Sequence, residues 1–243
     1  MKIFAMGGGE NGWNGSIYNM EMFDKEIIKL SGKSHPILLF IGFAAMVEEV
    51  YFEVIDYNFR RLGCNCGHLT RDDCKMGLAE MKIKAADIIY VGGGNTNKLM
   101  RALKKYHIDT LLSSGYCKNK VLCGVSAGAI CWCSFGNAVK RDRMAQKTTY
   151  RAHGIGLVNI MYCPHIIRDP FRKRGLEKML YRTKGVNGIA LDNAALEIIN
   201  GKYRILFLDN EESIAFKVVA DKTEVVWIKL SDMYFHDIHE LIN

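Results

Sequence analysis

Ser126 stands between two glycines in VLCGVSAGAICW (residues 121–132), directly after an apolar run. In hydrolases the G-x-S-x-G pattern forms a sharp turn between a strand and a helix. The turn exposes the serine hydroxyl, and the N–H of the next residue faces the oxyanion that develops during attack. The pattern predicts Ser126 as a nucleophile and Ala127 as an oxyanion donor. The alternative is a small residue where a strand packs against a helix.

A serine nucleophile needs a general base, and two histidines are candidates. His165 follows an apolar run and a proline in MYCPHII. This context predicts a position at the carboxyl end of a strand, on the same rim as Ser126. His153 in RAHGIG is the second candidate. Because a single histidine is more often structural than catalytic, the sequence alone leaves both assignments as hypotheses.

Two glycine runs also follow apolar segments, MGGGENGW (6–13) and VGGGNTNKL (91–99). Glycine permits positive φ and lets backbone N–H groups approach a ligand. The second run is typical of an anion or oxyanion cradle at a helix N-terminus, with Asn95 or Thr96 as the cap. A tight strand–helix turn without a ligand fits equally well. Neither run completes G-x-G-x-x-G with an acid about 20 residues later, which argues against a dinucleotide site.

Alternating strands and helices must position these groups. Continuous apolar runs predict buried strands at residues 2–6, 36–43, 86–93, 120–126 and 159–165. Apolar residues at helical spacing predict helices at residues 16–32, 48–63 and 96–115. This order predicts a three-layer α/β fold, with a mostly parallel sheet flanked by helices. Ligands of such folds bind beyond the carboxyl ends of the strands.

The last third of the chain has a different pattern. From residue 188 onward, short strand-like runs are separated by NGK, DNEE and ADKT. This spacing predicts antiparallel hairpins that extend the sheet. Three prolines and no Gly/Ser-rich linker give no sign of a domain boundary, so we expect one domain over residues 1–243.

The set VGGGNT, GVSAGAICW and PH resembles the dipeptidase E and cyanophycinase group of serine peptidases, whose fold resembles the class I glutamine amidotransferase domain, a flavodoxin-like architecture. His165 follows Ser126 by 39 residues, as in that group. The resemblance implies that Ser126 attacks the peptide carbonyl and that His165 acts as base and then as acid. It implies that Gly94 and Ala127 supply the oxyanion N–H groups. It also implies short substrates, often N-terminal aspartyl or isoaspartyl dipeptides.

The third member of the catalytic set departs from the family pattern. Relatives carry an Asp or Glu roughly thirteen to sixteen residues after the serine, which orients the histidine. Here Val139 and Arg141 fill the nearer positions, and Asp142 is the first acid. We expect either that Asp142 orients His165 after a slight shift in register, or that a Ser–His dyad operates. A weakened or inactive member that binds a peptide or partner is a further alternative.

Further residues are candidates for substrate binding. The resemblance places Asp192 and Asn193 in a late loop that borders the active site, where they could contact the substrate amine or the histidine. A solvated turn is the alternative. Arg168 could bind an acidic side chain or a C-terminal carboxylate in a bidentate contact, although a solvated surface arginine is the simpler interpretation. Asn95 is a further candidate for substrate binding, because it belongs to the glycine loop at residues 91–99.

Composition limits the other classes of function. The chain has 243 residues and a net charge of +7, with Lys and Arg dense at 140–151 and 168–174. This balance favours a solvated surface, with a bias toward anionic substrates. No aromatic–basic motif predicts nucleic-acid binding, and no apolar run approaches the ~18 residues of a membrane span. Eight cysteines without a secretion signal favour a cytoplasmic protein. A homodimer is compatible with the sequence.

Metal and rival hydrolase sites are weakly supported. Cys64, Cys66, His68 and Cys74 lie close together, but their spacing does not match structural zinc sites, so no metal or cofactor is expected. An α/β-hydrolase esterase would use a late histidine, such as His236 or His239, with an upstream HG-type loop that this sequence lacks. A glutamine amidotransferase would need cysteine in place of the elbow serine.

Overall fold

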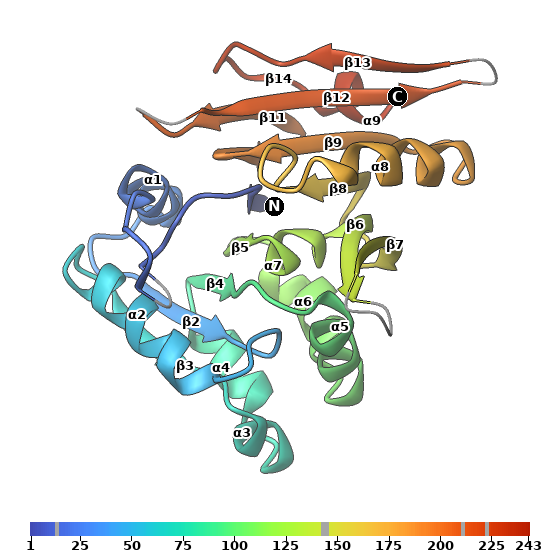
Figure 1. Cartoon of the computed structure of the whole chain (residues 1–243). Helices are drawn as coiled ribbons and strands as arrows, with labels where there is room; N and C mark the ends of the chain where they lie inside the picture. Colours follow the sequence, from blue (N-terminus) through green and yellow to red (C-terminus); the bar gives the residue numbers. More distant parts are fainter. Residues whose placement is uncertain (13–14, 142–145, 210–211, 222–223) are drawn as a thin grey trace.

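Two β-sheets organise the chain in the computed structural model, which describes residues 1–12, 15–141, 146–209, 212–221 and 224–243 (Figure 1). The larger sheet has the strand order β14-β11-β10-β1-β5-β4-β2-β3. Its members are β1 (Lys2–Met6), β2 (Ile37–Ile41), β3 (Asn65–His68), β4 (Ile88–Val91), β5 (Val121–Val125), β10 (Ala194–Ile199), β11 (Lys202–Phe207) and β14 (His236–Asp237). The five strands from β1 to β3 in this order are parallel, and β10, β11 and β14 add antiparallel strands at one edge.

The smaller sheet has the order β13-β12-β9-β8-β6-β7. Its members are β6 (Cys133–Arg141), β7 (Lys147–His153), β8 (Val158–Pro164), β9 (Asn187–Asp192), β12 (Ile214–Ala220) and β13 (Val225–Lys229). Strands β6, β8 and β9 run parallel, while β7, β12 and β13 pair antiparallel. The carboxyl ends of β8 and β9 therefore lie next to each other.

Helices cover both faces of the larger sheet, and one helix packs on the smaller sheet. They are α1 (Glu21–Ser31), α2 (Glu48–Arg60), α3 (Arg71–Lys75), α4 (Ala79–Ala85), α5 (Thr96–Lys105), α6 (Ile108–Ser113), α7 (Ala127–Ile130), α8 (Phe171–Tyr181) and α9 (Ile238–Ile242). Phe4 and Met6 pack in one core with α1 and α2, whereas Ile3 and Ala5 pack in a second core with α4 to α7. This alternation follows from the two-residue period of a strand. Helix α8 packs on the smaller sheet in a third core.

The predicted fold class is confirmed, and the details differ in four places. The run at 159–165 forms β8, but in the smaller sheet rather than the larger one. The hairpin β10–β11 extends the larger sheet as expected, whereas β12–β13 joins the smaller sheet through β9. The single helix predicted over 96–115 is wrong: it is divided into α5 and α6, because His107 adopts a left-handed φ of 56°.

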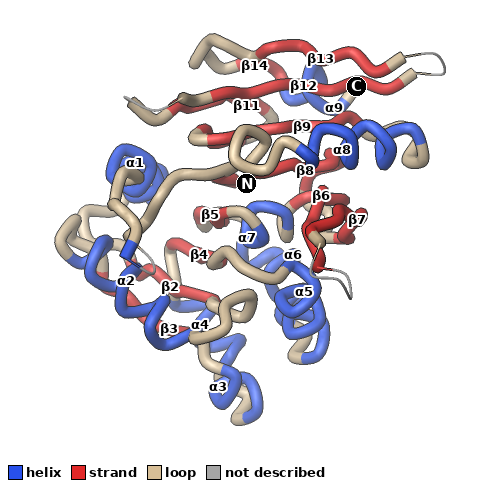
Figure 2. The backbone as a smooth tube through the Cα atoms, viewed as in Figure 1, coloured by secondary structure: helices blue, strands red, loops and turns tan. Residues whose placement is uncertain are grey.

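The long segment between β1 and α1 is mostly loop, as Figure 2 shows. The helix predicted over 16–32 begins only at Glu21, and Met20 before it makes no side-chain cap. This loop runs past the carboxyl end of β1, where the candidate catalytic residues also lie.

Candidate active site

Ser126 lies at the turn between β5 and α7 with φ 56° and ψ −109°. A positive φ is strained for a residue that carries a Cβ, and such strain gathers at functional sites. The side chain is half-buried, and its hydroxyl has no hydrogen-bond partner among the described residues. The strand–turn–helix context predicted for the elbow is therefore present, with the half-buried Ser126 at its tip.

The flanking glycines are required by packing. A Cβ on Gly128 would lie 2.0 Å from the Val91 carbonyl oxygen, and one on Gly124 would lie 2.6 Å from the Gly128 backbone. No side chain fits at either distance, so the two glycines let α7 begin directly against β4 and β5. The turn at Ser126 is closed as tightly as the backbone allows.

His165 follows the last residue of β8 and also has a positive φ, 58°. Its backbone N–H donates to the Gly7 carbonyl oxygen at 2.8 Å, while the Ser126 N–H donates to the Met6 carbonyl oxygen at 3.0 Å. Two consecutive carbonyl groups at the end of β1 thus hold the backbones of both residues. The larger sheet presents Ser126 and the smaller sheet presents His165, and β1 joins them.

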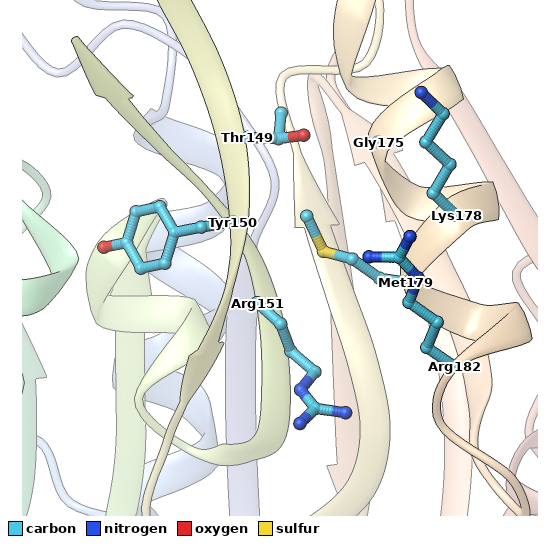
Figure 3. A pocket seen from close by; sticks show the side chains of 7 residues that line it. All are labelled: Thr149, Tyr150, Arg151, Gly175, Lys178, Met179 and Arg182. Carbon is cyan, nitrogen blue, oxygen red and sulfur yellow. The ribbon is translucent and has the colours of Figure 1, made fainter. Parts of the chain in front are cut away.

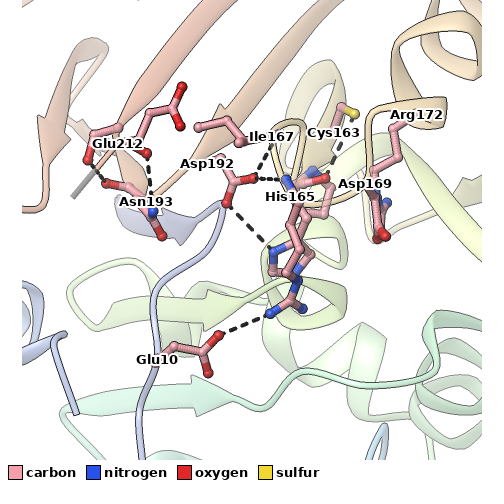
Figure 4. Close-up of polar contacts among 12 residues, drawn as sticks. Glu10, Cys163, His165, Ile167, Asp169, Arg172, Asp192, Asn193 and Glu212 are labelled. Atoms are coloured by element: carbon pink, nitrogen blue, oxygen red, sulfur yellow. Dashed lines mark hydrogen bonds and ion pairs between the residues drawn. The ribbon is translucent and has the colours of Figure 1, made fainter. Parts of the chain in front are cut away.

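Asp192, the last residue of β9, carries the carboxylate that faces His165 (Figure 4). The Asp192 Oδ1 atom lies 3.9 Å from His165 Nδ1, and both side chains are almost fully buried. Oδ2 accepts hydrogen bonds from the N–H groups of Ile167 at 2.8 Å and Arg168 at 3.0 Å. Asp192 therefore holds the turn that follows His165 and approaches its ring. The gap exceeds a hydrogen bond, and such contacts often shorten only when substrate binds.

The pKa of His165 is lowered to about 3, mainly by burial and also by the positive charges of Arg168 and Arg172, against the opposing effect of Asp169. A buried imidazole loses hydration in its charged form, so the neutral form is favoured. Burial also raises the pKa of Asp192, although the N–H groups of Arg168 and Ile167 oppose this. At neutral pH the site therefore contains a neutral imidazole, the form that can accept a proton.

Two backbone N–H groups beside the elbow have no hydrogen-bond acceptor in the part of the chain that the structure describes. Among the described residues, the N–H groups of Gly94 and Ala127 make no hydrogen bond. Ala127 is the first residue of α7, whose initial N–H groups have no acceptor within the helix. Gly94 has φ 135°, and a Cβ there would lie 2.4 Å from the Ala44 carbonyl oxygen. The two donors predicted for an oxyanion are therefore available.

A cavity of about 390 Å³ opens beside His165. Its walls come from the loop after β1, the turn after β8 and the turn after β9; the lining residues are Gly9, Glu10, Ile17, Asn19, His165, Ile167, Arg168, Asp192, Asn193 and Glu212. Arg168 Nη1 donates to Glu10 Oε1 at 3.1 Å, and both side chains are solvent-accessible. Sequence reasoning missed Glu10, although it lies within the first glycine run.

The chain matches the model of peptidase family S51 over residues 3–206. This chain belongs to that family. It is 27% identical to the uncharacterized peptidase YgaJ of Bacillus subtilis, over 96% of this chain and 98% of YgaJ. It is 31% identical to the uncharacterized peptidase Lmo0363 of Listeria monocytogenes, over 59% of this chain and 71% of Lmo0363.

A solved structure has the same fold as this S51 peptidase. It is a peptidase from an acI-B1 Actinobacterium, with a TM-score of 0.70, 20% sequence identity, and coverage of 97% of this chain and 96% of that one. At this identity the likeness shows the fold. Along the described residues, no helix is both long enough and apolar enough to cross a membrane.

Of the other predicted residues of this peptidase, Asn95 and His153 lie away from the cavity beside His165, whereas Asn193 lines it. The Asn95 side chain caps α5 by accepting from the Lys98 N–H at 2.9 Å, so it is committed to the helix. His153 ends β7, where its ring packs against Phe135 at 5.1 Å. Asp142 lies outside the described residues. Asn193 has a left-handed φ of 46°, and its side chain donates to the Glu212 carbonyl oxygen at 3.1 Å.

The structure does not assemble a metal site or an esterase site from the residues that the sequence suggested for them. Within the described residues no group of three or more His, Cys, Asp or Glu side chains is arranged to hold a metal ion. The His68 ring stacks on Phe52 at 4.9 Å. His236 lies 2.7 Å from Asp232, on the edge strand β14. His239 lies in α9, so neither late histidine joins the elbow.

A second cavity, also about 390 Å³, lies between β7 and α8. It is lined by Thr149, Tyr150, Arg151, Gly175, Lys178, Met179 and Arg182 (Figure 3). Residues 140–184 contain twelve Lys and Arg against three Asp and Glu, and the fold brings these basic segments together here. The polar groups of this lining are three cationic side chains and the hydroxyl groups of Thr149 and Tyr150. The lining residues include no serine, cysteine, histidine or carboxylate.

Proposed function

We propose that this S51 peptidase is a serine exopeptidase that hydrolyses dipeptides or short peptides, with Ser126 as nucleophile and His165 as general base. One observation carries the proposal. Ser126 and His165 both adopt strained positive φ values, and consecutive carbonyl groups of β1 hold their backbones side by side. Such strain is stable only when the surrounding structure enforces it, and here that structure is the meeting of two sheets.

The reaction follows from the positions of the side chains. Ser126 Oγ attacks the substrate carbonyl while His165 Nε2 takes the hydroxyl proton. The N–H groups of Gly94 and Ala127 donate to the oxyanion. His165 then gives the proton to the leaving amine, and a water molecule hydrolyses the acyl-enzyme by the same steps in reverse order.

In this proposal Asp192, rather than Asp142, orients the imidazole. Asp192 Oδ1 faces His165 Nδ1. The carboxylate thereby keeps the imidazole proton on Nδ1 and leaves Nε2 unprotonated, so that Nε2 can act as the base. Its negative charge also stabilises the imidazolium that forms during the reaction. The two backbone N–H groups on Oδ2 fix the carboxylate in place. The set becomes Ser126–His165–Asp192.

The cavity beside His165 supports a short substrate. Its volume lies at the lower end of the range for small-molecule pockets, about 300–1,000 Å³. Arg168 is an exposed residue of the cavity lining, and within the described residues its side chain pairs with Glu10 alone. We propose that an acidic substrate side chain can replace Glu10 on Arg168, which favours N-terminal Asp-X dipeptides.

A fluorophosphonate probe tests the nucleophile directly. We expect the purified protein to be labelled, Ser126→Ala to lose the label, and Ser134→Ala, a matched serine in β6, to keep it. Folded parent protein that remains unlabelled would count against an activated serine. A panel of Asp-X, isoAsp-X and neutral dipeptides then tests specificity. Arg168→Gln should lower kcat/KM for Asp-X more than for neutral dipeptides, and equal losses would exclude the Arg168 assignment.

A further inference from the structure

Tyr51, on helix α2, places its hydroxyl beneath the glycine loop that follows β4. The residue is 4% exposed. Its hydroxyl accepts hydrogen bonds from Asn11 Nδ2 at 2.9 Å and from the Gly93 N–H at 3.4 Å. Its ring lies so close to the loop that a Cβ on Gly92 would be 2.9 Å from Tyr51 Cε1. Both the ring and the hydroxyl of Tyr51 therefore contact the backbone of the loop.

The hydroxyl belongs to a small buried polar network. Asn58, about two helical turns further along α2, donates from Nδ2 to the Asn11 carbonyl oxygen at 2.9 Å. Asn11, Tyr51 and Asn58 are all buried, with exposures of 8%, 4% and 4%. Burying polar groups lowers stability unless they are hydrogen-bonded, and a satisfied network rigidifies its surroundings. This network ties together α2, the loop after β1 and the glycine loop.

The hydrogen bonds of the glycine loop show what the network achieves. The N–H of Gly92 donates to Ile41 at 3.0 Å, and that of Asn95 donates to Ala44 at 3.0 Å. The N–H of Gly93 donates to Tyr51. In this stretch of the described chain, the N–H of Gly94 alone makes no hydrogen bond. The loop is fixed on both sides of its one free donor.

The free donor lies beside the elbow. A Cβ on Gly93 would be 3.5 Å from Ser126 Cβ, so the loop and the elbow are in contact. We propose that Tyr51 is a positioning residue for peptide hydrolysis, whose hydroxyl fixes the peptide group before Gly93 and thereby aims the Gly94 N–H at the oxyanion. This inference rests on the proposed function, because it assigns Gly94 to the oxyanion site.

Packing alone does not require the hydroxyl. Phe40 packs edge-on against the Tyr51 ring with centroids 5.1 Å apart, and a phenylalanine ring would keep that contact. Pre-organised donors lower the barrier because they need not reorient as charge develops. Without the hydroxyl, the Gly93 N–H loses its partner and the three glycines gain freedom. The oxyanion would then be bound by a donor that must first be ordered.

Tyr51→Phe tests the proposal, with Tyr57→Phe on the exposed face of the same helix as the matched control. We expect kcat for the best dipeptide to fall roughly tenfold to a hundredfold, less than the ~10²–10³ of a deleted donor. KM should change by less than about twofold, since the oxyanion contact forms only in the transition state. The Ki of a matching dipeptide aldehyde, which forms a hemiacetal with Ser126, should rise in parallel with the loss of kcat/KM. Tyr57→Phe should match the parent.

Asn58→Ser provides a second variant, because it releases Asn11 without changing Tyr51. It should lower kcat in the same direction by a smaller factor, with KM unchanged. Parental kcat in Tyr51→Phe, or a loss confined to KM, would overturn the proposal. A loss of kcat without a matching rise in the aldehyde Ki would also overturn it. Activity retained in Ser126→Ala would instead refute the proposed function, so the two failures are distinguishable.

Discussion

The two cavities of similar volume differ in how the backbone and the charges around them are held. Beside His165, three of the five described non-glycine residues with positive φ come together: Ser126, His165 and Asn193. Buried His165 and Asp192 face each other there. Between β7 and α8, no described lining residue has positive φ, and Lys178 and Arg182 are exposed without an ion-pair partner in the described chain. Volume and charge therefore do not distinguish the two cavities, whereas enforced strain and buried ionisable groups favour the one beside His165 as the catalytic site that we propose.

The largest expected effect is at the elbow. Ser126→Ala should lower kcat by a factor of about 10⁶, because the nucleophile is lost. Ser126→Gly should be equally inactive but more stable than Ser126→Ala by about 1 kcal/mol, since glycine accepts φ 56° without strain. Chemical denaturation of both variants measures the difference.

The control is Ser134, the second residue of β6. There the order should reverse, with the glycine variant less stable than the alanine variant by about 0.5–1 kcal/mol. If Ser126→Gly is also less stable than Ser126→Ala, the elbow is not strained, and the contrast between the two cavities loses its main support.

The next effect concerns Asp192, the acid that we propose orients His165. Asp192→Asn should lower kcat/KM by about 10²–10⁴, because the amide no longer favours the required tautomer or stabilises the imidazolium. Asp169→Asn is the matched comparison, since this carboxylate lies near His165 but pairs with Lys147 at 3.2 Å. Asp142→Asn tests the acid expected from the family spacing. A larger loss in either comparison variant than in Asp192→Asn would show that the wrong carboxylate has been assigned.

The pH dependence of activity should reflect the buried imidazole. Since the pKa of His165 is lowered from 6.5 to about 3, the neutral base persists through mildly acidic pH. The acid limb of kcat/KM should therefore lie well below pH 6.5, as measured over about pH 4 to 8. A limb near the ordinary histidine pKa would indicate that the ring is more hydrated than its burial implies.

Stability should change in the same pH window. The folded pKa lies below the unfolded one, so protonation favours the unfolded chain. This contribution is fully present above pH 6.5 and is lost as the pH falls toward 3. His165→Gln should reduce the acid destabilisation, which urea denaturation at pH 5 and pH 8 would detect. An unchanged pH dependence in this variant would assign the acid sensitivity to other groups.

The smallest effect is expected at the second cavity. Lys178→Ala combined with Arg182→Ala should leave kcat/KM for neutral dipeptides within about twofold of the parent, since exposed substitutions usually change free energies by less than about 0.5 kcal/mol. The two substitutions remove exposed cations that line the cavity between β7 and α8. A tenfold loss would make this cavity part of the active site and break the comparison.

Local patterns in the sequence were sufficient for the first half of the fold and for the elbow. The strands at 2–6 and 120–126 were predicted because continuous apolar runs mark buried parallel strands, and β1 and β5 follow them closely. The Ser126 turn was predictable because a strand–turn–helix elbow of this shape leaves no room for a Cβ at Gly124 or Gly128. Any sequence that forms such a turn must therefore carry glycine at these positions. The strain at His165 could not be predicted, since nothing near it in the sequence specifies a positive φ.

The second sheet was not anticipated as a separate unit. The hairpin β6–β7 falls in a basic, polar stretch whose pairing depends on β8, which comes later in the chain. The register of β8 and β9 decides that Pro164 pairs with Leu191, which brings the residues after both strands to one edge. Sequence spacing alone left Asp192 with two roles, as a contact of the substrate or of the histidine.

The sequence by itself determined which groups could react: a serine on a glycine-flanked turn, a histidine after a buried strand and a glycine loop with free backbone donors. These depend on local sterics and on apolar periodicity, which act over a few residues. Only the tertiary structure decided which acid faces His165 and how the two sheets bring that histidine beside the elbow. Both outcomes rest on hydrogen bonds that join the ends of β1, β8 and β9. More than 150 residues of chain separate β1 from β8, and pairing over such a distance leaves no local pattern in the sequence.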